Sequence, residues 1–143
     1  MIPEREYAAI LERIPILCVD IVIRNGQGRY LLVCRRNEPL KGQWWVVGGR
    51  VLKGETIEAA ARRKVQEEVS LTASHLQPIG YYEGFFDKHP FATESPLHTV
   101  SVVFSTDIED HDVALDSQSS DWRYDARLPA DFVVHPFGGT TGR

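Results

Sequence analysis

Apolar residues recur along the chain at two spacings, one typical of helices and the other of strands. In the segment 3–14 they fall on one helical face, which predicts a short amphipathic helix that ends before Pro15. The residues that set this spacing are Tyr7, Ile10, Leu11 and Ile14. Two apolar, β-branched runs follow at 16–24 and 29–35, with an Asn-Gly-Gln-Gly turn before the second. These runs predict two strands joined as a hairpin.

Shorter apolar runs and polar loops alternate through the rest of the chain. The expected elements, in chain order, are a strand at 44–47, a glycine-bounded loop at 48–54, a helix at 56–69, strands at 76–86 and 98–106, and a short last strand at 122–124. Thr56 is the expected N-cap of the second helix. Because no internal repeat or linker interrupts this series, we expect a single domain over residues 1–143.

Composition and charge limit the class of protein to which the chain can belong and the partners that it can have. A chain of 143 residues with 43% apolar residues can bury a sizeable core. Its formal net charge of −4 argues against a nucleic-acid partner, and no apolar stretch is long enough to span a bilayer. The N-terminus lacks a signal-peptide pattern, so we expect a cytoplasmic protein with no membrane partner. Cys18 and Cys34 are expected to be buried free thiols.

The segment 48–71 carries the candidate chemistry. Glu67 and Glu68 lie together on the third turn of the expected helix, and Lys64 lies one turn before them on a neighbouring surface. Two adjacent carboxylates repel each other, and a hard divalent cation such as Mg²⁺ relieves that repulsion. The glycines at the start of the segment allow the backbone to approach a ligand closely, where a carbonyl oxygen can also bind a metal.

The same segment resembles the Nudix box, a family motif with a glycine, a glutamate and an arginine–glutamate cluster at fixed spacing. The matching positions are Gly49, Glu55, Arg63, Val65, Glu67, Glu68 and Leu71. Two positions depart from the motif, since Lys64 replaces the first Glu of the cluster and Ser70 replaces a Gly. The resemblance implies an α/β Nudix fold, an α/β/α sandwich around a mixed sheet. It also implies a hydrolase of nucleoside diphosphate derivatives that uses Mg²⁺, with Mn²⁺ as an alternative.

Segments outside the box resemble one branch of that family, the GDP-mannose mannosyl hydrolases, which also lack part of the carboxylate cluster. The similar segments include Asp20, residues 31–35, Asn37, Pro39, Arg50, Phe85, His98 and residues 118–123. Enzymes of this branch attack C1 of the sugar and release the nucleoside diphosphate. The resemblance therefore implies a nucleotide-sugar substrate and a homodimer.

The resemblance also implies roles for individual residues. The expected metal ligands are Gly49, Glu67, Glu68 and Gln118. The residues expected to bind substrate are Asp20, Arg35 and Arg50, and those expected to take part in catalysis are Asp20, Arg35 and Glu68. For Asp20, a purely structural pairing with an arginine is an equal alternative. Arg63 is expected to be the structural partner of a carboxylate, and Glu55 to hold the loop.

The chain lacks one residue that is typical of this branch. Its general base is a histidine, and Ser119 stands at that place here. A serine hydroxyl is too weak a base to serve unaided, and His111, His98 and His89 are the other options. Two alternatives to hydrolysis of a nucleotide sugar at C1 therefore stay open. One is phosphoanhydride cleavage in a nucleoside triphosphate or dinucleotide, and the other is an inactive nucleotide-binding module.

Overall fold

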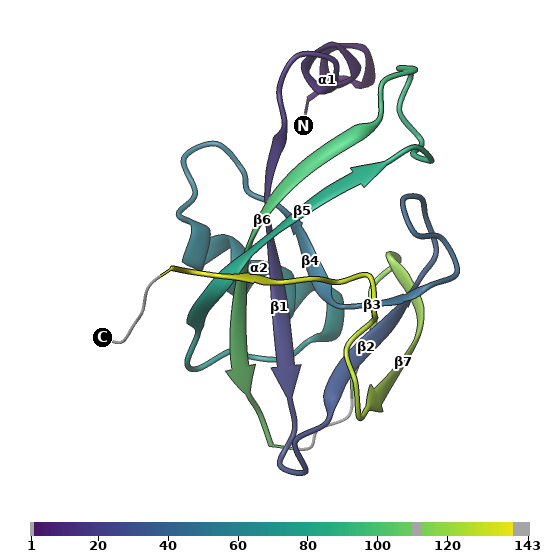
Figure 1. Ribbon diagram of the computed structural model, residues 1–143. Coiled ribbons are helices and arrows are strands. Elements are labelled where there is room, and N and C mark those ends of the chain that lie inside the picture. The colour runs from purple at the N-terminus through teal and green to yellow at the C-terminus, as the bar shows by residue number, and fades with distance from the viewer. Residues whose placement is uncertain (1, 110–112, 139–143) are drawn as a thin grey trace.

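The computed structural model describes residues 2–109 and 113–138, which form two helices and one mixed β-sheet (Figure 1). In chain order the elements are α1 (Glu4–Leu11), β1 (Ile16–Arg24), β2 (Tyr30–Arg35), β3 (Trp44–Trp45), β4 (Val47–Arg50), α2 (Ile57–Val69), β5 (Gln77–Phe86), β6 (Leu97–Asp107), β7 (Ser119–Asp125) and β8 (His135–Pro136). The expected helices, the four long strands and the mixed sheet are confirmed. No helix in the described parts of the chain is long and apolar enough to cross a membrane.

Strand β1 lies at the centre of the sheet, parallel to β6 along its whole length and antiparallel to β4. The expected hairpin of β1 and β2 is wrong for most of its length, because the two strands pair only where Arg24 lies opposite Tyr30. Beyond that pair β2 turns away to β3 and β7, and β4 takes its place beside β1. The loop expected to begin at Gly48 is therefore a strand up to Arg50, with Gly48 opposite Asp20.

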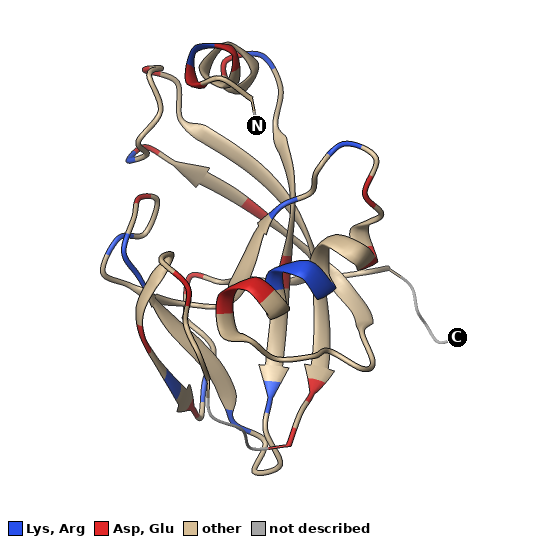
Figure 2. Cartoon of the chain, turned by 180° about the vertical axis from the view of Figure 1, so that it is seen from behind, with Lys and Arg blue, Asp and Glu red and all other residues tan. Residues whose placement is uncertain are grey.

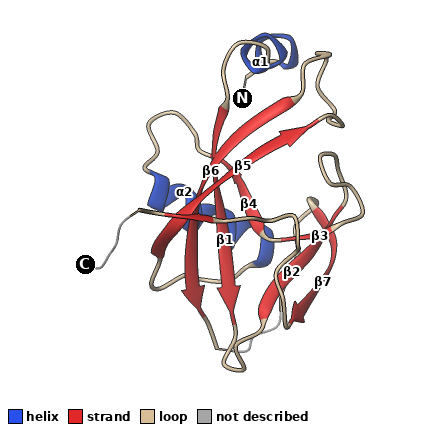
Figure 3. Ribbon diagram, viewed as in Figure 1, coloured by secondary structure: helices blue, strands red, loops and turns tan. Residues whose placement is uncertain are grey.

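Side chains alternate across β1 because successive residues of a strand point to opposite faces. Val19, Ile21 and Ile23 are buried on the face that α2 covers, in a core that also holds Val65 and Val69 of that helix. Asp20 and Val22 point to the other face. Figure 3 shows α2 behind the sheet, with α1 beyond its upper end.

Helix α2 begins and ends at residues with identifiable caps. The Thr56 hydroxyl accepts a hydrogen bond from the Ala59 amide over 3.1 Å, which confirms Thr56 as the N-cap. The helix ends at Ser70, whose φ of 57° lies in the left-handed region that favours glycine. The Ser70 hydroxyl donates to the carbonyl of Ala114 over 3.0 Å, which ties the helix end to the late loop.

An extended C-terminal segment, including β8, covers the second face of the sheet. It crosses in front of the sheet in Figure 1, and Phe132 packs there with Trp45, Tyr82 and Val103. Among the described residues, this extended segment occupies the layer where the sandwich description expects a helix. Pro129 and Pro136 lie in this segment, and proline lacks the amide hydrogen that an interior helix position needs.

Candidate active site

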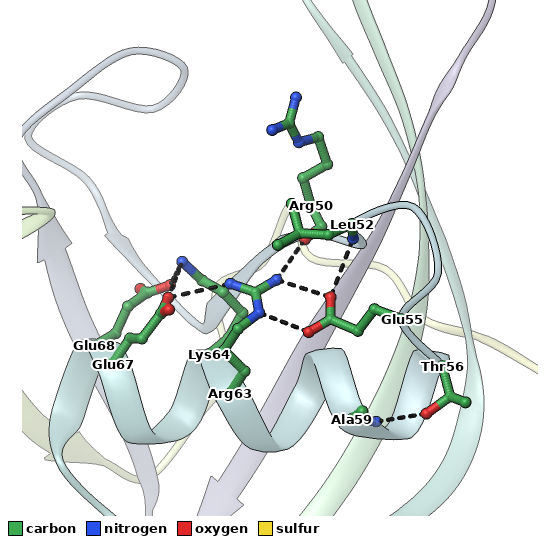
Figure 4. Close-up of polar contacts among 9 residues, drawn as sticks. All are labelled: Arg50, Leu52, Glu55, Thr56, Ala59, Arg63, Lys64, Glu67 and Glu68. Atoms are coloured by element: carbon green, nitrogen blue, oxygen red, sulfur yellow. Dashed lines mark hydrogen bonds and ion pairs between the residues drawn. The ribbon is translucent and has the colours of Figure 1, made fainter. Parts of the chain in front are cut away.

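An ion pair holds the loop before α2 against the helix (Figure 4). Arg63 Nε lies 2.7 Å from Glu55 Oε2, and Arg63 Nη2 lies 3.1 Å from Glu55 Oε1. Arg63 Nη2 also donates to the carbonyl of Arg50 over 2.9 Å, and Glu55 Oε1 accepts from the Leu52 amide over 3.0 Å. The hydrogen bond from Arg63 lowers the pKa of Glu55. The expected structural part of Arg63 and Glu55 is confirmed.

The carboxylates at the other end of α2 are already paired with cations of the chain. Lys64 Nζ lies 3.0 Å from Glu68 Oε2 and 3.5 Å from Glu67 Oε1, and Arg63 Nη1 lies 3.1 Å from Glu67 Oε1. Figure 2 shows the basic stretch of α2 and, after two uncharged residues, its acidic stretch. The Lys64 and Glu68 side chains are 11% and 4% exposed, whereas that of Glu67 is 47% exposed. Burial raises the pKa of Glu68 to about 7, against the lowering effect of Lys64.

The glycine pair of β4 separates two buried polar groups. At Gly49 a Cβ atom would lie 2.6 Å from Lys64 Cε, closer than real Cβ contacts, and 3.1 Å from Lys64 Nζ. At Gly48 a Cβ atom would overlap the carboxylate of Asp20. The close approach that the sequence predicts at these glycines is therefore made by side chains of the chain itself. At this point only the backbone of β4 separates Lys64, on the α2 side, from Asp20, on the other side.

Asp20 lines a cavity of about 110 Å³ on the face of the sheet opposite α2. Other residues that line it are Arg35, Trp45, Tyr82, Thr99 and Ser101. Asp20 is 8% exposed, and burial raises the pKa of its carboxyl to about 6, although a hydrogen bond with Ser101 and the charge of Arg35 oppose the shift. Among the described residues, Asp20 has no ion-pair partner within direct contact, so a structural pairing with an arginine does not account for it.

Arg35 links the cavity to the carboxylates of α2. It ends β2, and its Nε donates to the carbonyl of Pro39 over 2.7 Å. Burial lowers the pKa of its guanidinium, while the charges of Glu68 and then Asp20 raise it. Within the described chain neither Nη atom of Arg35 has a hydrogen-bond partner, so both can donate to a ligand.

The structure places Arg50 apart from this cavity. Its guanidinium lies over the ring of Tyr7, with Cζ 4.7 Å from the ring centroid. Figure 4 shows the side chain pointing away from the carboxylates of α2. Arg50 lines a larger groove of about 870 Å³ between α1 and the loop that follows β4. Arg35 and Arg50, expected together on a diphosphate, therefore line different hollows.

The late loop reaches the end of α2 through Asp116 and Gln118. The Asp116 amide donates to the carbonyl of Glu68 over 3.4 Å, and the charge of Asp116 helps to raise the pKa of Glu68. The exposed Gln118 donates its amide to Asp116 Oδ1 over 2.9 Å, and its carbonyl accepts from the Arg36 amide over 3.1 Å. Sequence reasoning brought Gln118 to this neighbourhood but missed Asp116, because an aspartate in a polar loop carries no signal of its own.

Two of the histidines considered as general bases, His98 and His89, lie away from the cavity. His98 stacks on Phe85 with ring centroids 4.4 Å apart, on the opposite face of β6 from Thr99. His89 Nε2 lies 2.8 Å from the carbonyl of Ser95 within its own loop. His111 lies outside the described residues. Strand β7 begins at Ser119, earlier than expected, and buries that serine opposite Arg35.

The carboxylate pair does not fit a metal ion bound between Glu67 and Glu68. A cation bound there would need the place that the Lys64 ammonium holds, within ion-pair distance of both carboxylates. In residues 2–109 and 113–138, no group of three or more His, Cys, Asp or Glu side chains is arranged to hold a metal ion. The assignment of Gly49, Glu67, Glu68 and Gln118 as metal ligands stays a prediction, and the place between the two carboxylates is held by Lys64.

Comparison with known proteins gives one consistent result. The family model for the NUDIX domain matches residues 15–132. The low-salt glycan biosynthesis protein Agl8 of Haloferax volcanii is 34% identical over 119 residues, which are 83% of this chain and 76% of that protein. The ADP-ribose pyrophosphatase of Methanocaldococcus jannaschii is 34% identical over 94 residues, which are 66% of this chain and 52% of that protein.

The solved structures agree with the sequence comparisons. The crystal structure of the MutT protein from Methanosarcina mazei Go1 superposes with a TM-score of 0.68 at 25% identity, over 84% of this chain and 89% of that one. The NUDIX domain of Shewanella oneidensis NrtR, solved with ADP ribose, superposes with a TM-score of 0.64 at 20% identity, over 86% of this chain and 82% of that one. The expected α/β Nudix fold is confirmed.

Proposed function

Because the chain belongs to the Nudix hydrolase family, whose members act on nucleoside diphosphate derivatives, we propose that it hydrolyses a nucleotide sugar to the sugar and a nucleoside diphosphate. The observation that carries the proposal is the buried Asp20 carboxylate, which faces a small cavity beside Arg35. The similarity to a glycan biosynthesis protein supports it, since glycans are built from activated sugars.

The cavity suits one part of such a substrate. Pockets that enclose whole drug-sized ligands measure roughly 300–1,000 Å³, so about 110 Å³ admits one polar ring or phosphate group. The Asp20 carboxylate and the hydroxyls of Thr99 and Ser101 can hydrogen-bond sugar hydroxyls. Trp45 and Tyr82 line the same cavity and offer apolar surface to a sugar ring.

Asp20 is the group at the cavity that can accept a proton at neutral pH. Burial raises the pKa of the Cys18 thiol to about 12 and also raises that of the Tyr82 hydroxyl, so both stay protonated. Asp20, with a pKa of about 6, is ionised at pH 7 and has the affinity for protons that a general base needs.

The proposed reaction is a displacement at the sugar carbon. Water oxygen forms a bond to C1, the bond from C1 to the phosphate oxygen breaks with its electron pair, and a water proton passes to Asp20. The guanidinium of Arg35 stabilises the negative charge on the departing diphosphate through the Nη atoms that make no other hydrogen bond in the described chain.

Phosphoanhydride cleavage is the second candidate, favoured by the position of Glu68. Its carboxyl, with a pKa of about 7, lies on the α2 side of the glycine pair, away from the Asp20 cavity. A carboxylate whose pKa lies near neutral pH is suited to act as the general base for water attack on phosphorus. The similarity to an ADP-ribose pyrophosphatase supports this alternative.

Product analysis in isotopically labelled water separates the candidates. The protein is incubated with a panel of nucleotide sugars, nucleoside triphosphates and dinucleotides, and products are identified by phosphorus NMR and mass spectrometry. We expect a nucleoside diphosphate and a sugar that carries the label. A nucleoside monophosphate with label in phosphate would establish phosphoanhydride cleavage instead. Tight binding without any product would establish a nucleotide-binding module.

A further inference from the structure

We propose that the ammonium of Lys64 is a built-in cation that takes the place of a divalent metal ion between Glu67 and Glu68. The proposal goes beyond the proposed function, since it concerns the side of β4 opposite the Asp20 cavity. It follows from the failure of the carboxylate pair to fit a metal ion. Its consequence is that the wild-type chain binds no divalent ion at this carboxylate pair.

The first support is the position of Lys64. Its Nζ lies within ion-pair distance of both carboxylates, 3.0 Å from Glu68 and 3.5 Å from Glu67. The side chain is 11% exposed, so it does not extend into solvent as a surface lysine does. A lysine four residues before one carboxylate and three before the other can reach both from one helix.

The second support is the packing of the lysine against β4. The site of a Cβ atom on Gly49 lies 3.0 Å from Lys64 Cδ and 2.6 Å from Lys64 Cε. A side chain at this point would force the end of the lysine chain to move away from its present position. The glycine and the helix together hold the ammonium between the carboxylates.

The third support is the local charge. Lys64 and Arg63 place two positive charges within ion-pair distance of Glu67 and Glu68, and Arg63 is shared with Glu55. A divalent ion would have to displace Lys64 or accept repulsion from both cations, because like charges at short range disfavour each other. The chain itself therefore supplies the cation at this carboxylate pair.

The charge of Lys64 also reaches the substrate side of β4. Cys18 lines the Asp20 cavity, and Lys64 is among the charges that lower the pKa of its thiol, against the larger raising effect of burial. Only the thin glycine backbone separates the ammonium from that side.

Metal titration without substrate tests the proposal. Mn²⁺ is titrated into the wild-type chain and into Lys64→Glu by calorimetry, and the number of ions is checked by electron paramagnetic resonance. We expect Lys64→Glu to bind Mn²⁺ at a site that the wild type lacks. Its affinity for Mn²⁺ should be at least about tenfold above any binding measured for the wild type. Lys53→Met, which removes an exposed lysine from the loop before α2, is the matched control and should behave as the wild type.

A second substitution keeps the test decisive. Glu67→Gln changes a half-exposed carboxylate and should leave Mn²⁺ binding by the wild type unchanged, but weaken binding at least about tenfold in the Lys64→Glu background. If Lys64→Glu is too unstable without metal for calorimetry, the melting temperatures of the two proteins are compared with and without Mn²⁺. Mn²⁺ should raise the melting temperature of Lys64→Glu and not that of the wild type. Equal binding by wild type and Lys64→Glu would overturn the proposal, as would loss of wild-type binding in Glu67→Gln. None of these measurements depends on turnover, so a failure of nucleotide-sugar hydrolysis leaves the outcome readable.

Discussion

The two sides of strand β4 each hold a buried carboxylate, and the two are neutralised in different ways. On the α2 side, Glu68 has the Lys64 ammonium at 3.0 Å. On the cavity side, Asp20 has a hydrogen bond with Ser101 and only the more distant charge of Arg35. Burial raises the pKa of both, that of Glu68 to about 7 and that of Asp20 to about 6.

The difference separates a structural group from one available to substrate. A carboxylate with an ion partner in direct contact contributes to the packing of its helix, and removing the partner leaves a buried charge. A buried carboxylate that faces a cavity without such a partner is destabilising by itself and is typical of functional sites. The comparison therefore predicts opposite effects on stability for substitutions on the two sides of β4.

The largest expected effect is on activity and comes from Asp20→Asn. Asparagine keeps the shape of the side chain but cannot accept a proton, so hydrolysis should fall by roughly 10²–10⁴-fold, as for loss of a general base. The rate constant kcat is measured with the nucleotide sugar that the product panel identifies. Asp131→Asn, at an exposed aspartate, is the control. A loss below about threefold would exclude Asp20 as the proton acceptor.

The next effect is on stability and comes from Lys64→Met. Methionine keeps the apolar chain over Gly49 but removes the cation beside Glu68, so the pKa of Glu68 should rise further above 7 and the cost should appear at alkaline pH, up to about 3–5 kcal/mol where the carboxylate is ionised. Urea unfolding at pH 7 and at pH 9 measures the change, which should be small at pH 7 and large at pH 9, and Lys64→Met combined with Glu68→Gln should recover most of it. If Lys64→Met alone is as stable as the wild type at pH 9, the ion pair makes no net contribution to the fold.

On the other side of β4, Asp20→Asn should stabilise the chain at neutral pH. The folded pKa of about 6 lies above the ordinary 3.8, so ionisation costs the folded state up to about 3 kcal/mol at pH 7. The stability that the neutral Asp20 carboxyl contributes to the folded chain is fully present below pH 4 and is lost as the pH rises through 6. The gain of Asp20→Asn over wild type should therefore be largest at pH 7 and vanish near pH 4. A gain independent of pH would show that ionisation of Asp20 is not its cause.

The contrast between the two sides of β4 also marks how far the sequence leads. Periodicity and caps predicted α2 with Thr56 as its N-cap, and the motif predicted that Arg63 pairs with a carboxylate, which in the structure is Glu55, because these features depend on residues close in the chain. The pairing of β1 with β4 and the hydrogen bond of Asp20 with Ser101 depend on how distant strands associate. No local pattern encodes those partners.

The departure at Lys64 was visible in the sequence, but its consequence was not. Helix spacing placed the lysine one turn before the carboxylates and left open whether it paired with them or pointed to solvent. The answer depends on Gly49, which belongs to another element and leaves room for the lysine chain. The position of Arg50 was missed for a similar reason, since the Tyr7 ring that holds its guanidinium comes from α1.

The smallest expected effect distinguishes the two arginines. Arg35 faces the cavity with its Nη atoms available, so Arg35→Ala should weaken substrate binding or rate by at least about tenfold, the equivalent of a charge-assisted contact of roughly 1.5–3 kcal/mol. Arg50 lies over Tyr7, and the loss of such a stacking contact is worth roughly 0.5–1 kcal/mol, or about two- to fivefold at most. Michaelis constants and kcat for both variants measure the difference, with Tyr7→Leu as the control that removes the ring and the hydroxyl beside Arg50. If Arg50→Ala loses tenfold while Tyr7→Leu does not, Arg50 leaves the tyrosine to bind the diphosphate, as the sequence resemblance predicts. If the two variants lose activity equally and slightly, Arg50 acts through its contact with α1, and Arg35 alone of the two holds the diphosphate.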